Sequence, residues 1–471
     1  MNTTHHPREA PQFKSARRAY QNEMDLMRSA YLAGDEDSAT RHAVRAHILG
    51  QRYLIPHLVT HVWMMRMAWR RGDVADAMGQ LRRLMMVVPG WLIGWVPVGN
   101  PGLTSVNPLK SSAMPSDLAR YFVGDSIWYH VMRRLALLVL IALLGLAALA
   151  WQDSRRAVQA TALEHEWSNL RVEKVLGLGE STSLEILPLV NRHALAPDLQ
   201  TEAGVSYLIQ TDDRTILFDV GWNREQTTPS PLLHNMGMMG ILPSSIDTVF
   251  ISHAHRDHVG GAAAERARTF SMSPEGVDMT GKTLIAPLEM SHPGMKVEVL
   301  DKPQRLFAGV ASTGPIPRSL FIGRIDEQAL VVNVAGKGLI VIVGCGHQTI
   351  PKLLQRVREA FAEPIYGIVG DLHFPVPEGR MRMMGIDVQR FFASGDGPFS
   401  PLQRDQVLAE MDMLDSAGIQ FLAVGTHDTS DEMIQTFSKR FGQRFQQVEA
   451  GRAIRIGSNQ VPTADKVTTP Q

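Results

Sequence analysis

The chain of 471 residues has almost no cysteine and no excess of charge of either sign. Its one cysteine, Cys345, excludes an intramolecular disulfide framework and cysteine-rich zinc modules. Basic and acidic side chains number 47 each, so an electrostatic footprint for nucleic acid is not expected. The 17 histidines are therefore the main candidates for metal ligands, with oxygen donors beside them. A chain of this length predicts two or three domains.

One long apolar run without charge extends from Leu135 to Trp151, between arginine pairs at 133–134 and 155–156. As a helix it reaches about 25 Å, which is short for a membrane span but adequate with an interfacial tryptophan. We expect a single transmembrane helix over residues 133–151, and a buried core helix is the alternative. The run also resembles a secretory signal, although such a signal normally stands at an N-terminus. Because basic residues are more numerous before the span than after it, we expect a cytoplasmic N-terminus and an outward-facing C-terminal domain at the cytoplasmic membrane.

Residues 17–120 predict a small all-α module, preceded by a disordered tail at 1–16. The turn Gly34-Asp35 recurs as Gly72-Asp73, each time between amphipathic patterns, which indicates two packed helical hairpins. His57 and His61 are four apart on a helix and lie near His47 in the sequence. Such a pair can bind a metal, but packed or surface histidines are commoner. The module resembles a bacterial domain family of unknown function, and it could also contact a protein partner.

After a polar linker at 152–174, the pattern changes to short β-branched runs broken by glycine and proline. These runs predict a layered α/β domain over residues 175–458, followed by a disordered tail at 459–471. Its expected strands are 205–210, 215–219, 248–252, 329–334 and 338–343, and its expected helices include 351–362 and 404–417.

The sequence His253-Ala-His255-Arg-Asp257-His258 follows the apolar run that ends at Ser252, and Val-Gly-Gly comes after it. Four ligand-type side chains occupy six positions of a turn at the end of a strand. Alternate residues His253 and His255 can converge on one ion, while Asp257 and His258 face a second ion a few ångströms away. This spacing predicts a dinuclear metal site.

The same motif, preceded by Thr215-Ile-Leu-Phe-Asp219-Val-Gly, resembles the metallo-β-lactamase superfamily. The resemblance implies a four-layer αββα fold and three later ligands that follow apolar strands: His347, Asp371 and His427. By that carry-over His253, His255 and His347 hold one metal, Asp257, His258 and His427 hold the other, and Asp371 bridges them. The expected metals are two divalent ions, zinc first, with manganese or iron as alternatives. They lower the pKa of a bound water to about 7, and Asp257 orients that water or accepts its proton.

Four further side chains near these motifs are candidates for the cleft: His373, His234, His292 and Cys345. His373 follows Asp371 closely and can polarise a substrate oxygen or protonate a leaving group, and a surface role is the alternative. His234 is interpreted as a packing or capping residue, and His292 and Cys345 as structural. Asp257 and His373 are therefore the predicted catalytic residues.

Motifs such as Ser230–Ile241, Ser312–Arg318, Gly344–His347 and Gly370–Phe374 resemble one branch of the superfamily, the dihydropterin ribofuranosyl-aminobenzene phosphate synthase-like proteins. The resemblance implies a step that forms a C–N bond. Two departures from the branch, Asp371-Leu-His373 and His427-Asp428-Thr-Ser, favour hydrolysis instead, as does an outward-facing domain. We expect a membrane-anchored hydrolase of a small-molecule ester, phosphoester or lactone. The alternatives are a synthase or transferase on pterin-like phosphates and a non-enzymatic metal-binding interaction protein.

Overall fold

The computed structural model describes residues 11–95, 97–123 and 127–457. The chain divides into two compact units, residues 1–148 and 149–471, which are considered separately. The predicted tail at 459–471 lies outside the described residues, as do residues 1–10 of the predicted N-terminal tail. Residues 11–16 of that tail belong to the first helix.

The first unit is a pair of helical hairpins. Its main helices are α1 (Pro11–Ala33), α2 (Glu36–Gly50), α3 (Leu54–Arg70) and α4 (Val74–Ile93), followed by the short α5 (Ser116–Ala119) and η1 (Arg120–Phe122). The two predicted Gly-Asp turns join α1 to α2 and α3 to α4, and each aspartate caps the next helix by accepting from a backbone N–H. Met24, Met27, Met64 and Met67 pack between the hairpins, so these methionines fill the core of the unit.

Helix α6 (Ile127–Asn169) contains the predicted transmembrane segment. Its stretch Val131–Asn169 is long and apolar enough to cross a membrane. The most apolar 18-residue window of this stretch has a mean hydropathy of 2.4, and none of that window is buried. The helix also continues through most of the predicted linker. Near its end Leu163 and Trp167 are buried in the second unit, where the Trp167 indole N–H donates to Gln355 Oε1 at 2.9 Å. This part of the linker is therefore packed helix.

The second unit is built on two seven-stranded sheets. The first sheet has the order β18-β1-β2-β3-β4-β5-β6, with bounds Ile454–Gly457, Ser183–Val190, Ser206–Gln210, Thr215–Phe218, Thr248–Phe250, Thr283–Ala286 and Lys296–Val299. The second has the order β17-β16-β13-β12-β11-β8-β7, with bounds Phe445–Gln447, Phe421–Val424, Ile365–Gly370, Gly338–Val343, Leu330–Val334, Val310–Ser312 and Gln304–Phe307. Two small ribbons complete the strands: β9 (Ile316–Leu320) with β10 (Gly323–Glu327), and β14 (Arg382–Met383) with β15 (Ile386–Asp387).

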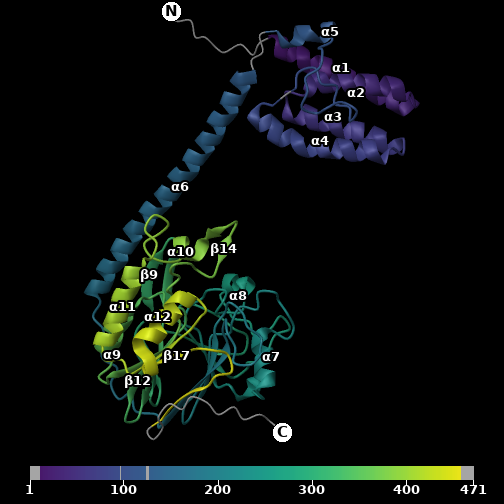
Figure 1. Cartoon of the computed structure of the whole chain (residues 1–471). Coiled ribbons are helices and arrows are strands. Elements are labelled where there is room, and N and C mark those ends of the chain that lie inside the picture. Colours follow the sequence, from purple (N-terminus) through teal and green to yellow (C-terminus); the bar gives the residue numbers. More distant parts are fainter. Residues whose placement is uncertain (1–10, 96, 124–126, 458–471) are drawn as a thin grey trace, which may run out of the picture. The chain divides into compact units, whose positions relative to one another are not determined.

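The helices of this unit lie outside the two sheets, as Figure 1 shows. They are α7 (Pro231–Met238), α8 (Ala262–Ala267), α9 (Ile350–Ala360), α10 (Val388–Phe392), α11 (Arg404–Ser416) and α12 (Asp431–Phe441), with single turns at Pro243–Ser245 and Gly442–Arg444. One apolar cluster lies between the sheets, a second joins the second sheet to α9, α11 and α12, and a third joins the first sheet to α7 and α8. The predicted four-layer αββα order is confirmed.

The predicted strands and helices are present, with ends that differ by a residue or two. Strand β12 illustrates why an apolar run predicts a central strand. All its residues from Gly338 to Val343 are buried, because β11 and β13 flank it and apolar layers cover both faces. The functional consequence lies at the carboxyl ends of β4, β12, β13 and β16. Each of these central strands ends just before one of the predicted ligand segments.

Candidate metal centre

The loop after β4 brings the predicted ligand motif into the interior. His253 and His258 are buried, and His255 and Asp257 are half-buried. Gly260 allows the loop to close, because its φ of +83° and the Ser271 carbonyl, which would lie 1.8 Å from an added Cβ, leave no room for a side chain. The motif is therefore held in one conformation by packing that only glycine permits.

A first donor group consists of His253, His255 and His347, whose ligand atoms lie within 4.8 Å of one another. His253 Nε2 and His255 Nδ1 are 3.1 Å apart. His347 arrives from the turn after β12, where the backbone N–H groups of Cys345, Gly346 and His347 donate to the buried Glu327 carboxylate at 2.7 to 3.0 Å. The structure brings together the three histidines that the sequence assigned to one metal.

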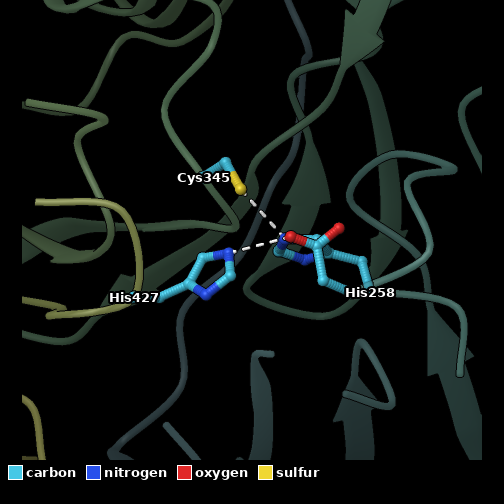
Figure 2. Close-up of side chains that lie close together, drawn as sticks. His258, Cys345 and His427 are labelled. Carbon is cyan, nitrogen blue, oxygen red and sulfur yellow. Dashed lines mark hydrogen bonds and ion pairs between the residues drawn. The ribbon is translucent and has the colours of Figure 1, made fainter. Parts of the chain in front are cut away.

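A second donor group consists of Asp257, His258, Cys345 and His427. His258 Nε2 lies 2.9 Å from Cys345 Sγ, and His427 Nε2 lies 3.1 Å from Asp257 Oδ2. Figure 2 shows the side chains of Cys345 and His427 both directed toward the end of the His258 side chain. This group contains the three side chains assigned to the second metal and adds a sulfur donor.

Asp219, at the end of β3, orients His258. Its Oδ2 accepts from His258 Nδ1 at 2.6 Å and from Ser252 Oγ at 2.7 Å, and its Oδ1 accepts from the Ser252 N–H at 2.7 Å. Because a carboxylate only accepts, the proton of His258 is fixed on Nδ1, and Nε2 faces the donor group. Burial lowers the pKa of His258, but the Asp219 carboxylate outweighs it, so the pKa is raised.

Asp371 was predicted to bridge two metal ions, and in the structure its partners are backbone N–H groups. Its two carboxylate oxygens accept from the backbone N–H groups of His427 and Asp428, at 3.1 and 3.2 Å. It belongs to none of the donor groups within the described residues. Its described contacts order the loop that carries His427, and burial raises the pKa of its carboxyl.

Asp428 lies among the donor side chains, although it was not predicted as a ligand. Its Oδ2 lies 3.2 Å from Cys345 Sγ and 2.9 Å from His373 Nδ1, and it forms a third donor group with Cys345 and His347. Burial raises its pKa, but His427 and His373 outweigh burial and hold the pKa well below the usual range. In the sequence Asp428 stands out only as a departure from the pterin branch, although an acid beside a predicted ligand histidine is a signal for a ligand.

The remaining predicted side chains divide between the site and its surroundings. His373 is buried with its ring 4.4 Å from that of His347, but its Nε2 donates to the Ala393 carbonyl at 2.7 Å while Nδ1 meets Asp428. His234 lies on α7 and contacts the Asp198 carbonyl at 3.0 Å, and His292 stacks on Phe270. Cys345, interpreted from the sequence as structural, lies within two donor groups.

The chemistry of the donor atoms fits a bound cation. Both ring nitrogens of His347 and Nδ1 of His427 are buried and have no hydrogen-bond partner, and His427 Nε2 faces the Asp257 carboxylate. Burial lowers the pKa of His427, but Asp428, Asp257 and Asp371 outweigh it and raise the pKa to about 10. Unpartnered nitrogens among several carboxylates call for positive charge, which a metal ion supplies.

Comparisons with known proteins match two parts of the chain to protein families. Residues 200–351 match the metallo-beta-lactamase superfamily, and residues 14–122 match a protein family of unknown function (DUF3703). Over 324 residues, 60% of this chain and 100% of the relative, the chain is 23% identical to the 7,8-dihydropterin-6-methyl-4-(beta-D-ribofuranosyl)-aminobenzene-5'-phosphate synthase of Methanocaldococcus jannaschii.

Two solved structures are also similar to the chain. One is a metal-dependent hydrolase of the beta-lactamase superfamily, with 19% identity, a TM-score of 0.41, and coverage of 58% of this chain and 100% of the other. The second is the metallo-beta-lactamase fold protein YhfI from Bacillus subtilis, with 15% identity, a TM-score of 0.36, and coverage of 58% and 99%.

Proposed function

The second unit belongs to the metallo-β-lactamase superfamily, and from this premise we propose that the protein is a membrane-anchored, metal-dependent hydrolase. The proposed substrate is a small molecule with an ester, phosphoester or lactone bond. Two divalent metal ions, zinc first and manganese or iron as alternatives, are the proposed cofactors.

The observation that carries the proposal is the meeting of two donor groups at the ends of β4, β12 and β16. His253, His255 and His347 would hold one ion, and the group of Asp257, His258, Cys345 and His427 would hold the other. Imidazole, carboxylate and thiolate together suit zinc. When bound, such ions lower the pKa of a water molecule from 15.7 to about 7 and so provide a nucleophile at neutral pH.

Asp257 is the side chain that would orient the activated water. Burial raises the pKa of Asp257, but the hydrogen bond and charge of His427 and the charge of His258 outweigh it and hold the pKa at about 2. The carboxylate therefore stays ionised at neutral pH and can orient water or accept its proton. Its side chain is 20% exposed, so a substrate can approach it.

His373 and Asp428 are a further pair of polar side chains beside the donor groups. Their contact of 2.9 Å holds the His373 ring beside His347, and the Gln389 amide also donates to Asp428. In this arrangement His373 can donate a proton to a leaving group once its bond to the Ala393 carbonyl is released. Asp371 contributes by ordering the His427 loop.

A second candidate function is synthesis or transfer on a pterin-like phosphate. It is favoured by the similarity to the Methanocaldococcus jannaschii synthase over that protein's whole length. The donor groups serve either reaction, because a metal site also activates and orients substrates. Product analysis separates the two candidates: a new C–N bond supports synthesis, and an added water supports hydrolysis.

Membrane anchoring through α6 is the second part of the proposal. Its apolar window is unburied and fits a span, and Arg120, Arg133 and Arg134 precede it. By the positive-inside rule the first unit then lies in the cytoplasm and the second unit faces outward. Fractionation should place the protein in membranes, and reporter fusions before Leu135 and after Trp151 should report opposite sides.

The hydrolase proposal is tested with the purified full chain in detergent. Phosphodiesters, lactones and β-lactams are screened with zinc and with manganese, beside the variant His255→Ala. We expect loss of at least about 100-fold in activity, because one donor of the first group is removed. The control His234→Ala changes a histidine outside the donor groups and should stay active. Full activity in His255→Ala or in metal-free protein would overturn the proposal.

A non-enzymatic role predicts a different outcome. If the protein acts by binding a partner through the first unit, a metal-site variant keeps the cellular phenotype and deletion of residues 1–120 abolishes it. If it is a hydrolase, His255→Ala alone abolishes the phenotype.

A further inference from the structure

Three histidines of the first unit lie with their Nε2 atoms close together. His47 comes from the last turn of α2, and His57 and His61 lie four residues apart on α3. Their Nε2 atoms are 3.0 Å apart for His47 and His57, and 3.2 Å apart for each of the other two pairs. Packing or surface roles are the commoner expectation for histidines with this spacing, whereas the structure directs all three Nε2 atoms at one point.

The hydrogen bonds of the other ring nitrogens fix the tautomers. His47 Nδ1 lies 2.9 Å from the Asn100 carbonyl, and His61 Nδ1 lies 2.8 Å from Gln80 Oε1. The Gln80 amide nitrogen donates to the Gly102 carbonyl at 3.1 Å, so its oxygen faces His61. Both acceptors require an N–H at Nδ1, which leaves a lone pair on each Nε2 of the neutral rings.

Lone pairs this close need a shared positive partner. A proton on His57 Nε2 can point well at only one of the other two nitrogens. A tetrahedral zinc ion with Zn–N bonds of about 2.05 Å instead places its ligand nitrogens about 3.3 Å apart. The observed separations lie within a few tenths of an ångström of that value.

Burial keeps the three rings in the form that binds metal. His47 is 3% exposed and His61 is 2% exposed. Neutral imidazole is the ligand form of histidine.

The loop after α4 is built around this cluster. The Asn100 side chain donates to the Asn107 and Lys110 carbonyls and accepts from the Gly102 N–H, which holds its own carbonyl against His47. Gly102 has a φ of +76°, and an added Cβ would lie 2.7 Å from the His47 ring. The backbone therefore approaches the imidazole as closely as glycine allows.

We propose that His47, His57 and His61 form a second, separate metal site that binds one divalent transition-metal ion of the zinc class. The three imidazole donors favour zinc, copper or nickel over magnesium and calcium. No carboxylate or thiol joins this group among residues 11–95, 97–123 and 127–457, so three nitrogens are its protein ligands. His57 is half-buried, and water or an exogenous ligand would supply the fourth ligand of a tetrahedral ion.

The test measures zinc per chain in the loaded and desalted full-length protein, beside His57→Gln. We expect the variant to hold about one ion fewer than the wild type, because three donors become two. The control His42→Gln changes a histidine of the same unit that pairs with Glu23 at 2.8 Å, outside the cluster, and should keep the wild-type content. Activity of the second unit should be unchanged in both variants. Equal zinc in the wild type and in folded His57→Gln would overturn the proposal.

A second measurement covers the case in which His57→Gln fails to fold. The background variant His255→Ala/Cys345→Ser weakens both donor groups of the second unit and leaves the first unit intact. Cobalt titrated into this protein should give ligand-field absorption of a nitrogen-coordinated ion without a thiolate band. Failure of cobalt to bind there, with the helices intact by circular dichroism, would also overturn the proposal.

Discussion

Replacing Asp219 by asparagine should impair metal binding without removing any ligand. The substitution keeps the size of the side chain, and asparagine tolerates the left-handed backbone of this position, φ +55°. Oδ1 accepts from the Ser252 N–H, which can only donate, so the amide oxygen must stay there. The amide nitrogen then takes the place of Oδ2 and points a donor at His258 Nδ1.

The consequence is a change of tautomer at His258. Its Nδ1 must accept, so the proton moves to Nε2, the atom that faces Cys345 at 2.9 Å. A protonated nitrogen cannot ligate, and keeping the original tautomer means losing the bond to residue 219. Loss of such an outer-shell partner typically costs 10- to 100-fold in metal affinity, which is about 1.4 to 2.7 kcal/mol.

The assay is competition for zinc between the full-length protein and a chromophoric chelator, with unfolding monitored in parallel. The control Asp247→Asn alters a carboxylate that accepts from the Thr215 N–H at 2.8 Å on the same sheet, and should leave zinc affinity unchanged. Ser252→Ala removes one bond to Asp219 but keeps the His258 tautomer, so its effect should be smaller. Wild-type zinc affinity in folded Asp219→Asn would refute the tautomer argument.

Three further predictions concern other parts of the second unit. Cobalt-loaded protein should show a thiolate charge-transfer band that Cys345→Ser abolishes, because the buried sulfur lies within two donor groups. Glu410→Gln should raise the unfolding temperature at pH 7.5 and not at pH 4. Burial raises the pKa of the Glu410 carboxyl, so its ionised form weakens the fold above that pKa. The glutamine keeps the hydrogen bond, because the Ile350 N–H can still donate to the amide oxygen. Gly260→Ala should destabilise the fold by about 1 to 3 kcal/mol in denaturant titration, because of its positive φ and its contact with the Ser271 carbonyl.

Each of these has an outcome that contradicts it. A wild-type cobalt spectrum without a thiolate band would remove Cys345 from the ligands. An equal stability of Glu410→Gln and wild type at both pH values would show that the buried carboxylate costs nothing. Gly281→Ala is the matched control for Gly260→Ala, since Gly281 also has a positive φ but nothing within 4 Å of an added Cβ, and a similar loss in both would assign the effect to φ alone.

The local pattern predicted the strands and the histidines that lie together after β4. Runs such as residues 338–343 are apolar throughout because both faces are covered, and the motif from His253 to His258 lies within one turn. Both features depend on neighbours in the sequence, so periodicity and spacing reveal them. The donor group of His253, His255 and His347 also required that β4 of the first sheet and β12 of the second sheet bring their carboxyl ends together.

The carboxylates and the sulfur were harder to predict. Asp371 and Asp428 both follow strands of the second sheet, and the sequence does not state which one turns toward the donors. The backbone N–H groups of the 427–428 loop decide it, since they hold the Asp371 carboxylate and leave Asp428 beside Cys345 and His373. Contacts of this kind form between segments that are distant in the chain.

The sequence alone determined the order of elements, the apolar helix and the histidine motif, because each follows from residues that are close together in the chain. Only the tertiary structure decided which acid and which sulfur join the donors, and that His47 meets His57 and His61 at a single point. The physical reason is that packing selects the histidine tautomer, the loop conformation and the strand end that together place each ligand atom. Those choices are made by hydrogen bonds such as those of Asp219 and Asn100, which link segments that the sequence keeps apart.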